Sequence, residues 1–257
     1  MRHTLFISDL HLCESRPQTT AAFLAWLAER VPQADALYIL GDFFEFWAGD
    51  DAVNTSFHQS IIQALKHITA SGTPISLMHG NRDFLIGDAF AEQTGIQLLA
   101  DPTLLKLYQQ PLLLTHGDAL CTDDVRYMAF RTTVRDPAWQ QAFLSQPLAE
   151  RLAYIQQARA ASTTEKASKQ AEIMDVNLDA LASLLRAYDY PPLLIHGHTH
   201  RPQQHVHEVD GHVCARWVLG DWYDQGSCLS LNEHGILAVE LLERGHHEIH
   251  PSLHQST

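Results

Sequence analysis

The first hundred residues alternate between short apolar runs and longer amphipathic segments. Apolar residues dominate positions 5–8, 36–40 and 75–78, and each run gives way at once to polar residues or glycine, as buried strands do. Positions 20–31 and 57–70 carry apolar residues at helical spacing. This alternation predicts an α/β core with parallel strands.

The rest of the chain changes character twice. Residues 104–107 and 112–115 flank a polar turn and predict a hairpin, and residues 123–188 favour helix almost throughout. Strand patterns then return at 193–195, 205–209, 213–219, 227–231 and 236–241. We therefore expect a core formed by residues 1–122 and 190–257, with residues 123–189 inserted as a helical lid.

Composition narrows the classes of function. The 257 residues suit one large domain with an insert, and a net charge of −13 disfavours a nucleic-acid partner, because phosphate backbones require basic surface. Four scattered cysteines without CxxC spacing indicate free thiols in a reducing compartment. No run of about 18 apolar residues occurs, so we expect any membrane contact to be peripheral.

The predicted insertion differs in charge from the rest of the chain. Between Arg126 and Lys169, seven basic residues stand against three acidic ones, a net charge of +4, and many aromatic and aliphatic residues lie among them. An ordinary pair of amphipathic helices covering the core would fit this composition. A lid that offers cations and apolar surface to an anionic substrate with apolar chains would fit it equally well.

Side chains that bind hard metal ions follow the predicted strands in five places. Any one of these segments alone is a weak signal, but the ordered set is a strong one. Carboxylate, amide and imidazole groups at the ends of strands suit Mn²⁺, Fe²⁺ or Zn²⁺. The five segments are Asp9-Leu10-His11, Gly41-Asp42, Gly80-Asn81-Arg82-Asp83, His116-Gly117-Asp118 and Gly197-His198-Thr199-His200.

This set resembles the motifs of the calcineurin-like metallophosphoesterases. The resemblance implies a four-layer α-β-β-α sandwich and two divalent metal ions that together activate water against a phosphoryl group. It assigns Asp9, His11, Asp42 and His200 to one metal, and Asp42, Asn81, His116 and His198 to the other, with Asp42 shared. It also implies catalytic roles for Asp42, Asn81, Arg82 and His116, whereas His79 and His196 are expected to serve packing.

Arg82 departs from the histidine that many relatives carry at this position. A histidine there can protonate a poor leaving group, whereas an arginine stays charged and instead grips phosphate through two hydrogen bonds. A phosphate leaving group needs little protonation. The departure therefore favours cleavage of a phosphoanhydride over cleavage of an alkyl phosphate ester.

Longer strings resemble one subgroup of this family. They include Asp118-Ala119-Leu120-Cys121-Thr122-Asp123-Asp124 and Ile173-Met174-Asp175-Val176-Asn177. Members of the subgroup use Mn²⁺ to hydrolyse an acylated UDP-sugar at its α-phosphorus in lipid A biosynthesis. This implies a cytoplasmic protein, peripheral on the inner membrane of a bacterium. By matched position, the expected substrate contacts are Asn81, Arg82, Asp124, Ser162, Lys166, Lys169 and His198, with Tyr127 and Arg159 as additions. Lys166 replaces an expected asparagine.

Two other functions fit parts of the sequence. The same scaffold could carry a phosphodiesterase or nucleotide pyrophosphatase with a soluble substrate. A non-catalytic scaffold would keep the fold and lose metal ligands, but every expected ligand is present here. A comparison of activity towards soluble nucleotides with activity towards the acylated UDP-sugar distinguishes the first alternative from the lipid-substrate hypothesis.

Overall fold

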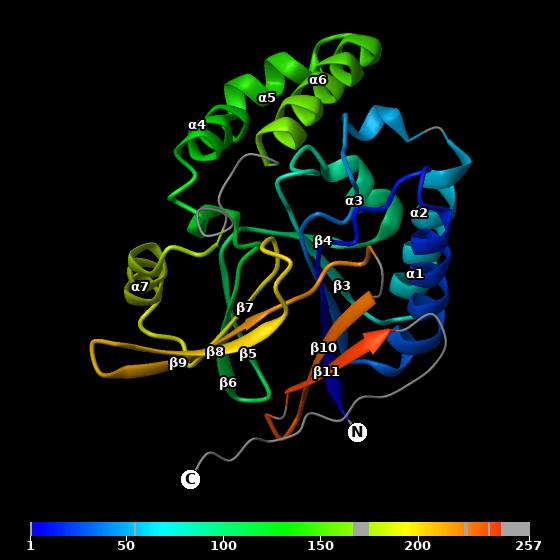
Figure 1. The fold of residues 1–257 in the computed structure, drawn as a ribbon. Helices are drawn as coiled ribbons and strands as arrows, with labels where there is room; N and C mark the ends of the chain where they lie inside the picture. The colour runs from blue at the N-terminus through cyan, green and yellow to red at the C-terminus, as the bar shows by residue number, and fades with distance from the viewer. Residues whose placement is uncertain (1, 54, 167–174, 224–225, 236, 243–257) are drawn as a thin grey trace.

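Two β-sheets face each other at the centre of the molecule, and helices lie on their outer sides (Figure 1). The computed structural model describes residues 2–53, 55–166, 175–223, 226–235 and 237–242. Within these ranges the element order begins with the predicted strand–helix alternation. The α/β class is therefore confirmed.

The first sheet has the order β11-β10-β1-β2-β3-β4. Strands β1, β2, β3 and β4 run parallel, and β10 joins β1 antiparallel, with Leu5 opposite both Leu37 and Ser230. The strands span His3–Ile7 (β1), Ala36–Leu40 (β2), Ile75–Met78 (β3), Gln97–Leu99 (β4), Gly226–Asn232 (β10) and Leu237–Leu242 (β11). The carboxyl ends of β1, β2 and β3 thus meet at one edge.

The second sheet has the order β5-β6-β7-β9-β8. Its hairpin β5–β6 confirms the one predicted around the polar turn, and β7 pairs parallel to both β6 and β9. The strands span Thr103–Leu107 (β5), Gln110–Leu114 (β6), Leu193–His196 (β7), Gln203–Val209 (β8) and His212–Val218 (β9). Because β6 and β7 are parallel, their carboxyl ends also lie side by side.

Three apolar clusters define the layers. One fills the space between the sheets and includes Phe6 and Ile195. A second packs the other face of the first sheet against α1 (Pro17–Arg30), α2 (Ser56–Ala70) and α3 (Asp88–Thr94). A third packs the second sheet against α7 (Leu178–Ala187). This is the expected α-β-β-α sandwich.

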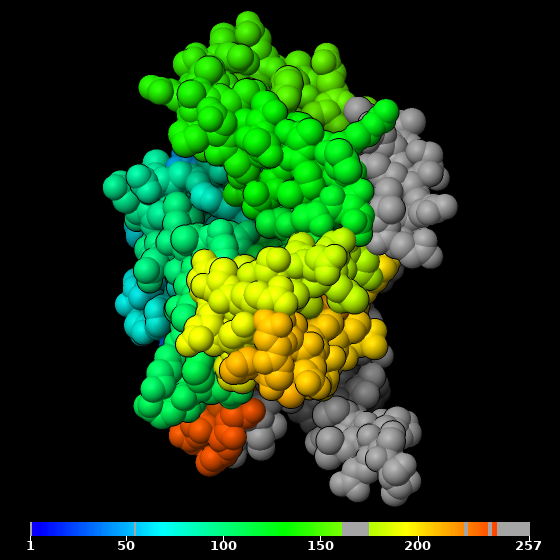
Figure 2. Space-filling model, turned by 90° about the vertical axis from the view of Figure 1, so that its left-hand side faces the viewer, coloured from blue at the N-terminus to red at the C-terminus, as the bar shows by residue number. Residues whose placement is uncertain are grey.

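The predicted insertion contains two structurally different parts. Helices α4 (Val125–Val134), α5 (Pro137–Leu144) and α6 (Leu148–Lys166) lie together at one end of the molecule, whereas α7 lies along the second sheet (Figures 1 and 2). The helix α7 is therefore a layer of the sandwich. None of the helices in the described ranges is long and apolar enough to cross a bilayer.

Candidate metal centre and substrate cavity

The predicted metal ligands follow the carboxyl ends of strands from both sheets. Asp9 and His11 follow β1, and Asp42 follows β2. The remaining ligands follow three other strands: Asn81 after β3, His116 after β6, and His198 and His200 after β7. The two sheets thus bring residues nearly two hundred positions apart in sequence to one place.

One group of donors gathers around Asp9, His11 and His200, whose ligand atoms lie within 4.8 Å of one another. The Nε2 atoms of His11 and His200 face each other at 3.3 Å, and Asp9 Oδ1 lies 3.2 Å from His200 Nε2. Asp42 approaches this group with Oδ2, 3.8 Å from His11 Nε2. These donors are the four that the family resemblance assigns to one metal.

A second group lies beside the first. Asn81 Oδ1 is 2.8 Å from His198 Nδ1 and 3.1 Å from His116 Nε2, and Asp42 Oδ1 is 3.7 Å from His116 Nε2. Asp42 thus presents one carboxylate oxygen to each group. Asp9 also comes within 4.8 Å of the second group, a proximity that the sequence did not suggest.

Backbone conformation marks the same residues. Five of the seven predicted ligands have a positive φ angle, between 50° and 66°, which residues other than glycine rarely adopt. These residues are Asp9, His11, Asp42, His198 and His200. Such strain collects at functional sites, where the surrounding structure enforces it.

The supporting contacts fix the ligand loops. Asp83 is fully buried and accepts hydrogen bonds from the backbone N–H groups of Phe43, Phe44 and Gly80. The backbone N–H of Arg82 donates to Asp42 Oδ1 at 2.8 Å. A Cβ atom on Gly80 would lie 2.1 Å from that same oxygen, so the approach of the two loops requires glycine there.

The donor chemistry fits a divalent cation. Burial lowers the pKa of His198 to about 3 and the pKa of His11 well below its usual value, so both rings are neutral and offer lone pairs. Burial also raises the pKa of Asp42 to about 7, with His116 acting in the opposite direction. Burial lowers the pKa of His116 and His200, but neighbouring carboxylates outweigh it and raise these values to about 9 and about 10, so both donor groups favour positive charge.

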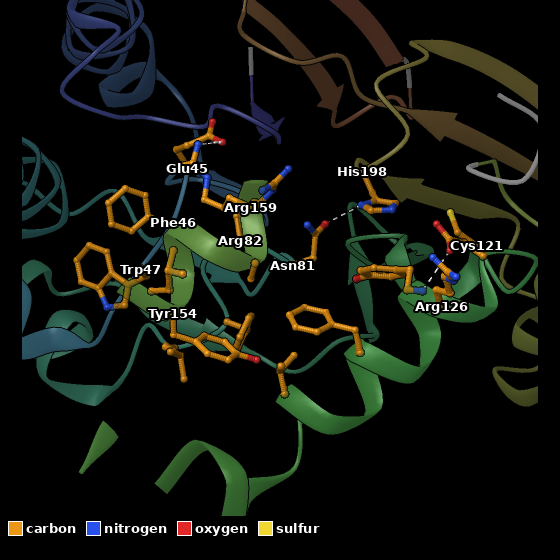
Figure 3. A pocket seen from close by; sticks show the side chains of 18 of the residues that line it. Glu45, Phe46, Trp47, Asn81, Arg82, Cys121, Arg126, Tyr154, Arg159 and His198 are labelled. Carbon is orange, nitrogen blue, oxygen red and sulfur yellow. Dashed lines mark hydrogen bonds and ion pairs between the residues drawn. The ribbon is translucent and has the colours of Figure 1, made fainter. Parts of the chain in front are cut away.

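A cavity of about 580 Å³ opens next to these ligands. Around Asn81 and His198 it is polar, and away from them it is walled by rings and aliphatic groups (Figure 3). The apolar lining comes from Phe46, Trp47, Phe84, Leu85, Phe130, Val134, Trp139, Phe143, Tyr154 and Ile155. Helices α4, α5 and α6 supply most of this wall.

Six of the nine predicted substrate contacts line this cavity: Asn81, Arg82, Asp124, Tyr127, Arg159 and His198. Lys169 lies outside the described residues, as do the side chains of Ser162 and Lys166. Asp124 caps α4 by accepting from the N–H of Tyr127 at 3.1 Å, and the Tyr127 ring stacks on His198, with centroids 5.9 Å apart.

The sequence did not identify several other lining residues. Phe46 and Trp47 lie four and five positions after Asp42 of the Gly-Asp motif, and Phe84 directly follows the Asn-Arg-Asp motif. An aromatic cluster beside two ligand motifs could have drawn attention to them. Arg126 and Arg201 add cations to the polar part of the lining.

Three arginines attach the helical segment, which comprises α4, α5 and α6, to the core. Arg135 donates to Gly80 O at 2.8 Å, and Arg159 donates to Glu45 at 2.7 Å. Arg151, only 2% exposed, donates to Ala48 O and to Asp51. The apolar wall of the cavity is therefore fixed relative to the metal ligands.

Known proteins share both the motifs and most of the length. The profile of the calcineurin-like phosphoesterase family matches residues 2–202, and the chain belongs to this family. A relative from Aromatoleum aromaticum is 52% identical over 88% of this chain and 91% of its own. A relative from Xanthomonas campestris pv. campestris is 51% identical over 93% and 98%. Both bear the name UDP-2,3-diacylglucosamine hydrolase.

Proposed function

We propose that the chain hydrolyses the pyrophosphate bond of UDP-2,3-diacylglucosamine, a step of lipid A biosynthesis. The products are UMP and 2,3-diacylglucosamine 1-phosphate. The observation that carries this proposal is the cavity: a polar end with metal-binding side chains and arginines continues into a wall of aromatic rings. A diphosphate with two acyl chains requires that combination.

The seven predicted ligands would hold two divalent cations, for which we propose Mn²⁺. When bound, such a pair supplies charge to the phosphoryl oxygens and a water of lowered pKa as nucleophile. Asp42, with one oxygen towards each donor group, is the ligand we assign to both cations. Asn81 Oδ1 lies between His116 and His198 and orders the second group.

The remaining groups bind and orient the substrate. Arg82 lines the cavity next to Asn81, where its guanidinium can hold phosphate oxygens in a bidentate grip. We infer attack at the α-phosphorus, with the acylated sugar phosphate leaving. That leaving group is weakly basic, so the absence of a histidine at position 82 costs little. Asp124, Tyr127, Arg159, Ser162, Lys166 and Lys169 are proposed to contact the rest of the substrate.

The membrane contact is assigned to the helical segment. Val125, Phe130, Leu144 and Tyr154 are large apolar side chains exposed on α4, α5 and α6. Phe130 and Tyr154 also line the cavity, so an acyl chain could pass from a lipid surface into it. This arrangement supports peripheral contact with a lipid surface, which we propose to be the cytoplasmic face of the inner membrane.

The experiment combines purified protein, Mn²⁺ and the acylated UDP-sugar in ¹⁸O water, with products analysed by mass spectrometry. We expect label in UMP. Label in the lipid phosphate would move the attack to the other phosphorus. Strong turnover of soluble nucleotide diesters, with none of the acylated sugar, would contradict the proposed substrate.

A further inference from the structure

Glu45 receives contacts from three separate parts of the chain. It follows β2 and lies at the rim of the cavity (Figure 3). One of its oxygens accepts from Arg16, which precedes α1, and the other accepts from Arg159 Nη2 of α6 at 2.7 Å. Its Oε2 also lies 3.7 Å from Nδ1 of His11, a predicted metal ligand.

The backbone holds Glu45 beside His11. The N–H of Glu45 donates to Leu12 O at 3.1 Å, and Phe44 forms a parallel bridge with Leu12. Nδ1 of His11 is buried without a hydrogen-bond partner among the described residues, and Glu45 Oε2 faces it. A carboxylate in that place orients a metal-binding imidazole and raises its basicity.

The same carboxylate fixes a cation of the cavity. Arg159 lines the cavity, and its guanidinium lies over the Phe46 ring, 5.5 Å from the centroid. The Glu45 side chain is only 11% exposed, so solvent screens its ion pairs less than pairs on the open surface. A long arginine side chain without this partner would sample many rotamers.

We propose that Glu45 is a positioning residue that couples the position of α6 to the geometry of the metal ligands. It orients His11 through Nδ1 and holds Arg159 at the cavity rim. The part that concerns substrate rests on the proposed function, whereas the part that concerns metal binding stands without it. Metal binding and the placement of α6 then support each other through one side chain.

The first test is a calorimetric titration of metal-free protein with Mn²⁺. We expect Glu45→Gln to weaken at least one of the two binding events about 10-fold, as loss of such partners of metal ligands does. Asp51→Asn is the matched control, because it removes the same charge from Arg151, another arginine of α6. It should leave Mn²⁺ affinity within about twofold of wild type if α6 anchoring alone has no effect on the metals.

The second test separates coupling from general loosening. At saturating Mn²⁺, Glu45→Gln and Arg159→Gln should each raise KM for the acylated UDP-sugar, and the KM of the double variant should stay close to that of Arg159→Gln. Glu45→Asp, which keeps the charge, should recover part of the Mn²⁺ affinity and provides a second variant if the glutamine variant folds poorly. Unchanged Mn²⁺ affinity in Glu45→Gln, or equal weakening in Asp51→Asn, would overturn the inference. The titration needs no substrate, so failure of the proposed reaction would leave it readable.

Discussion

At the scale of single residues, the candidate metal centre depends on backbone conformations with positive φ, which residues other than glycine rarely adopt. Each ligand with positive φ costs about 1–3 kcal/mol and persists only because its surroundings enforce that conformation. Here the two ligand loops enforce each other: the N–H of Asp9 donates to Gly41 O, and the N–H of His11 donates to Asp42 O. The strain is therefore held by contacts between loops that follow neighbouring strands.

Asp42→Ala tests the ligand shared between the two groups. We expect loss of at least one bound metal and a fall in kcat of about a thousandfold or more, because charge stabilisation of the transition state is usually the largest contribution to catalysis. Elemental analysis of dialysed protein gives the metal content, and UMP release gives the rate. Asp210→Ala removes an exposed carboxylate that pairs with Arg186, and it should change neither quantity. Full turnover at reduced metal content would refute the assignment.

At the scale of elements, the apolar pattern predicted the strands and helices that bury one long face. Helices α1 and α2 appear where Phe23, Leu27, Ile61 and Leu65 recur at helical spacing, and these four side chains are buried. The short helix α3 and strand β4 were not predicted. Helix α3 has only seven residues, of which Phe90 and Thr94 are buried, too few to produce a recognisable period.

The site itself divides in the same way. The ligands were predictable because each follows a strand and belongs to a known order of motifs. The placement of α4, α5 and α6 over those ligands comes from tertiary contacts such as Arg151 with Ala48 O, which leave no periodic trace in the sequence. For the same reason, nothing in the sequence indicated that Arg16 and Arg159 would both reach Glu45.

Arg151→Met tests how α6 is fastened. Its guanidinium donates to the carbonyls of Ala48 and Gln146, and removal leaves these without that donor. We expect a loss of about 1–3 kcal/mol in the free energy of unfolding, measured by urea denaturation. Arg186→Met breaks an exposed pair with Asp210 and should lower the free energy of unfolding clearly less than Arg151→Met does. Equal effects of the two substitutions would show that Arg151 is not a structural anchor.

At the scale of the whole molecule, charge and burial are distributed unevenly. The chain has a net charge of −13, yet the cavity is lined by four arginines contributed by different elements: Arg82, Arg126, Arg159 and Arg201. An anionic substrate therefore meets local positive charge on an acidic protein. Burial of the histidines is also uneven. Several of the seventeen lie where burial disfavours the charged form of the ring.

Among these histidines, His58 lies away from the predicted metal ligands and offers a separable pH effect. It packs among Phe44, Trp47 and Phe57, with ring centroids 4.9 to 5.8 Å away. Burial lowers its pKa below 6.5, with Glu14 acting in the opposite direction. Well above pH 6.5 the ring is neutral in both the folded and the unfolded chain and contributes no pH dependence. Below pH 6.5 the unfolded chain binds the proton first, so stability falls until the folded pKa is passed.

We therefore expect the free energy of unfolding of wild type to fall more steeply between pH 6.5 and 5 than that of His58→Gln. The measurement is urea denaturation at constant ionic strength across this range, with EDTA present so that metal binding does not contribute. His67→Gln, which removes an exposed histidine from the same helix, is the matched control. The sign is decisive: a steeper fall in His58→Gln than in wild type would mean that folding favours the charged ring, and that packing among three aromatic side chains does not set its protonation.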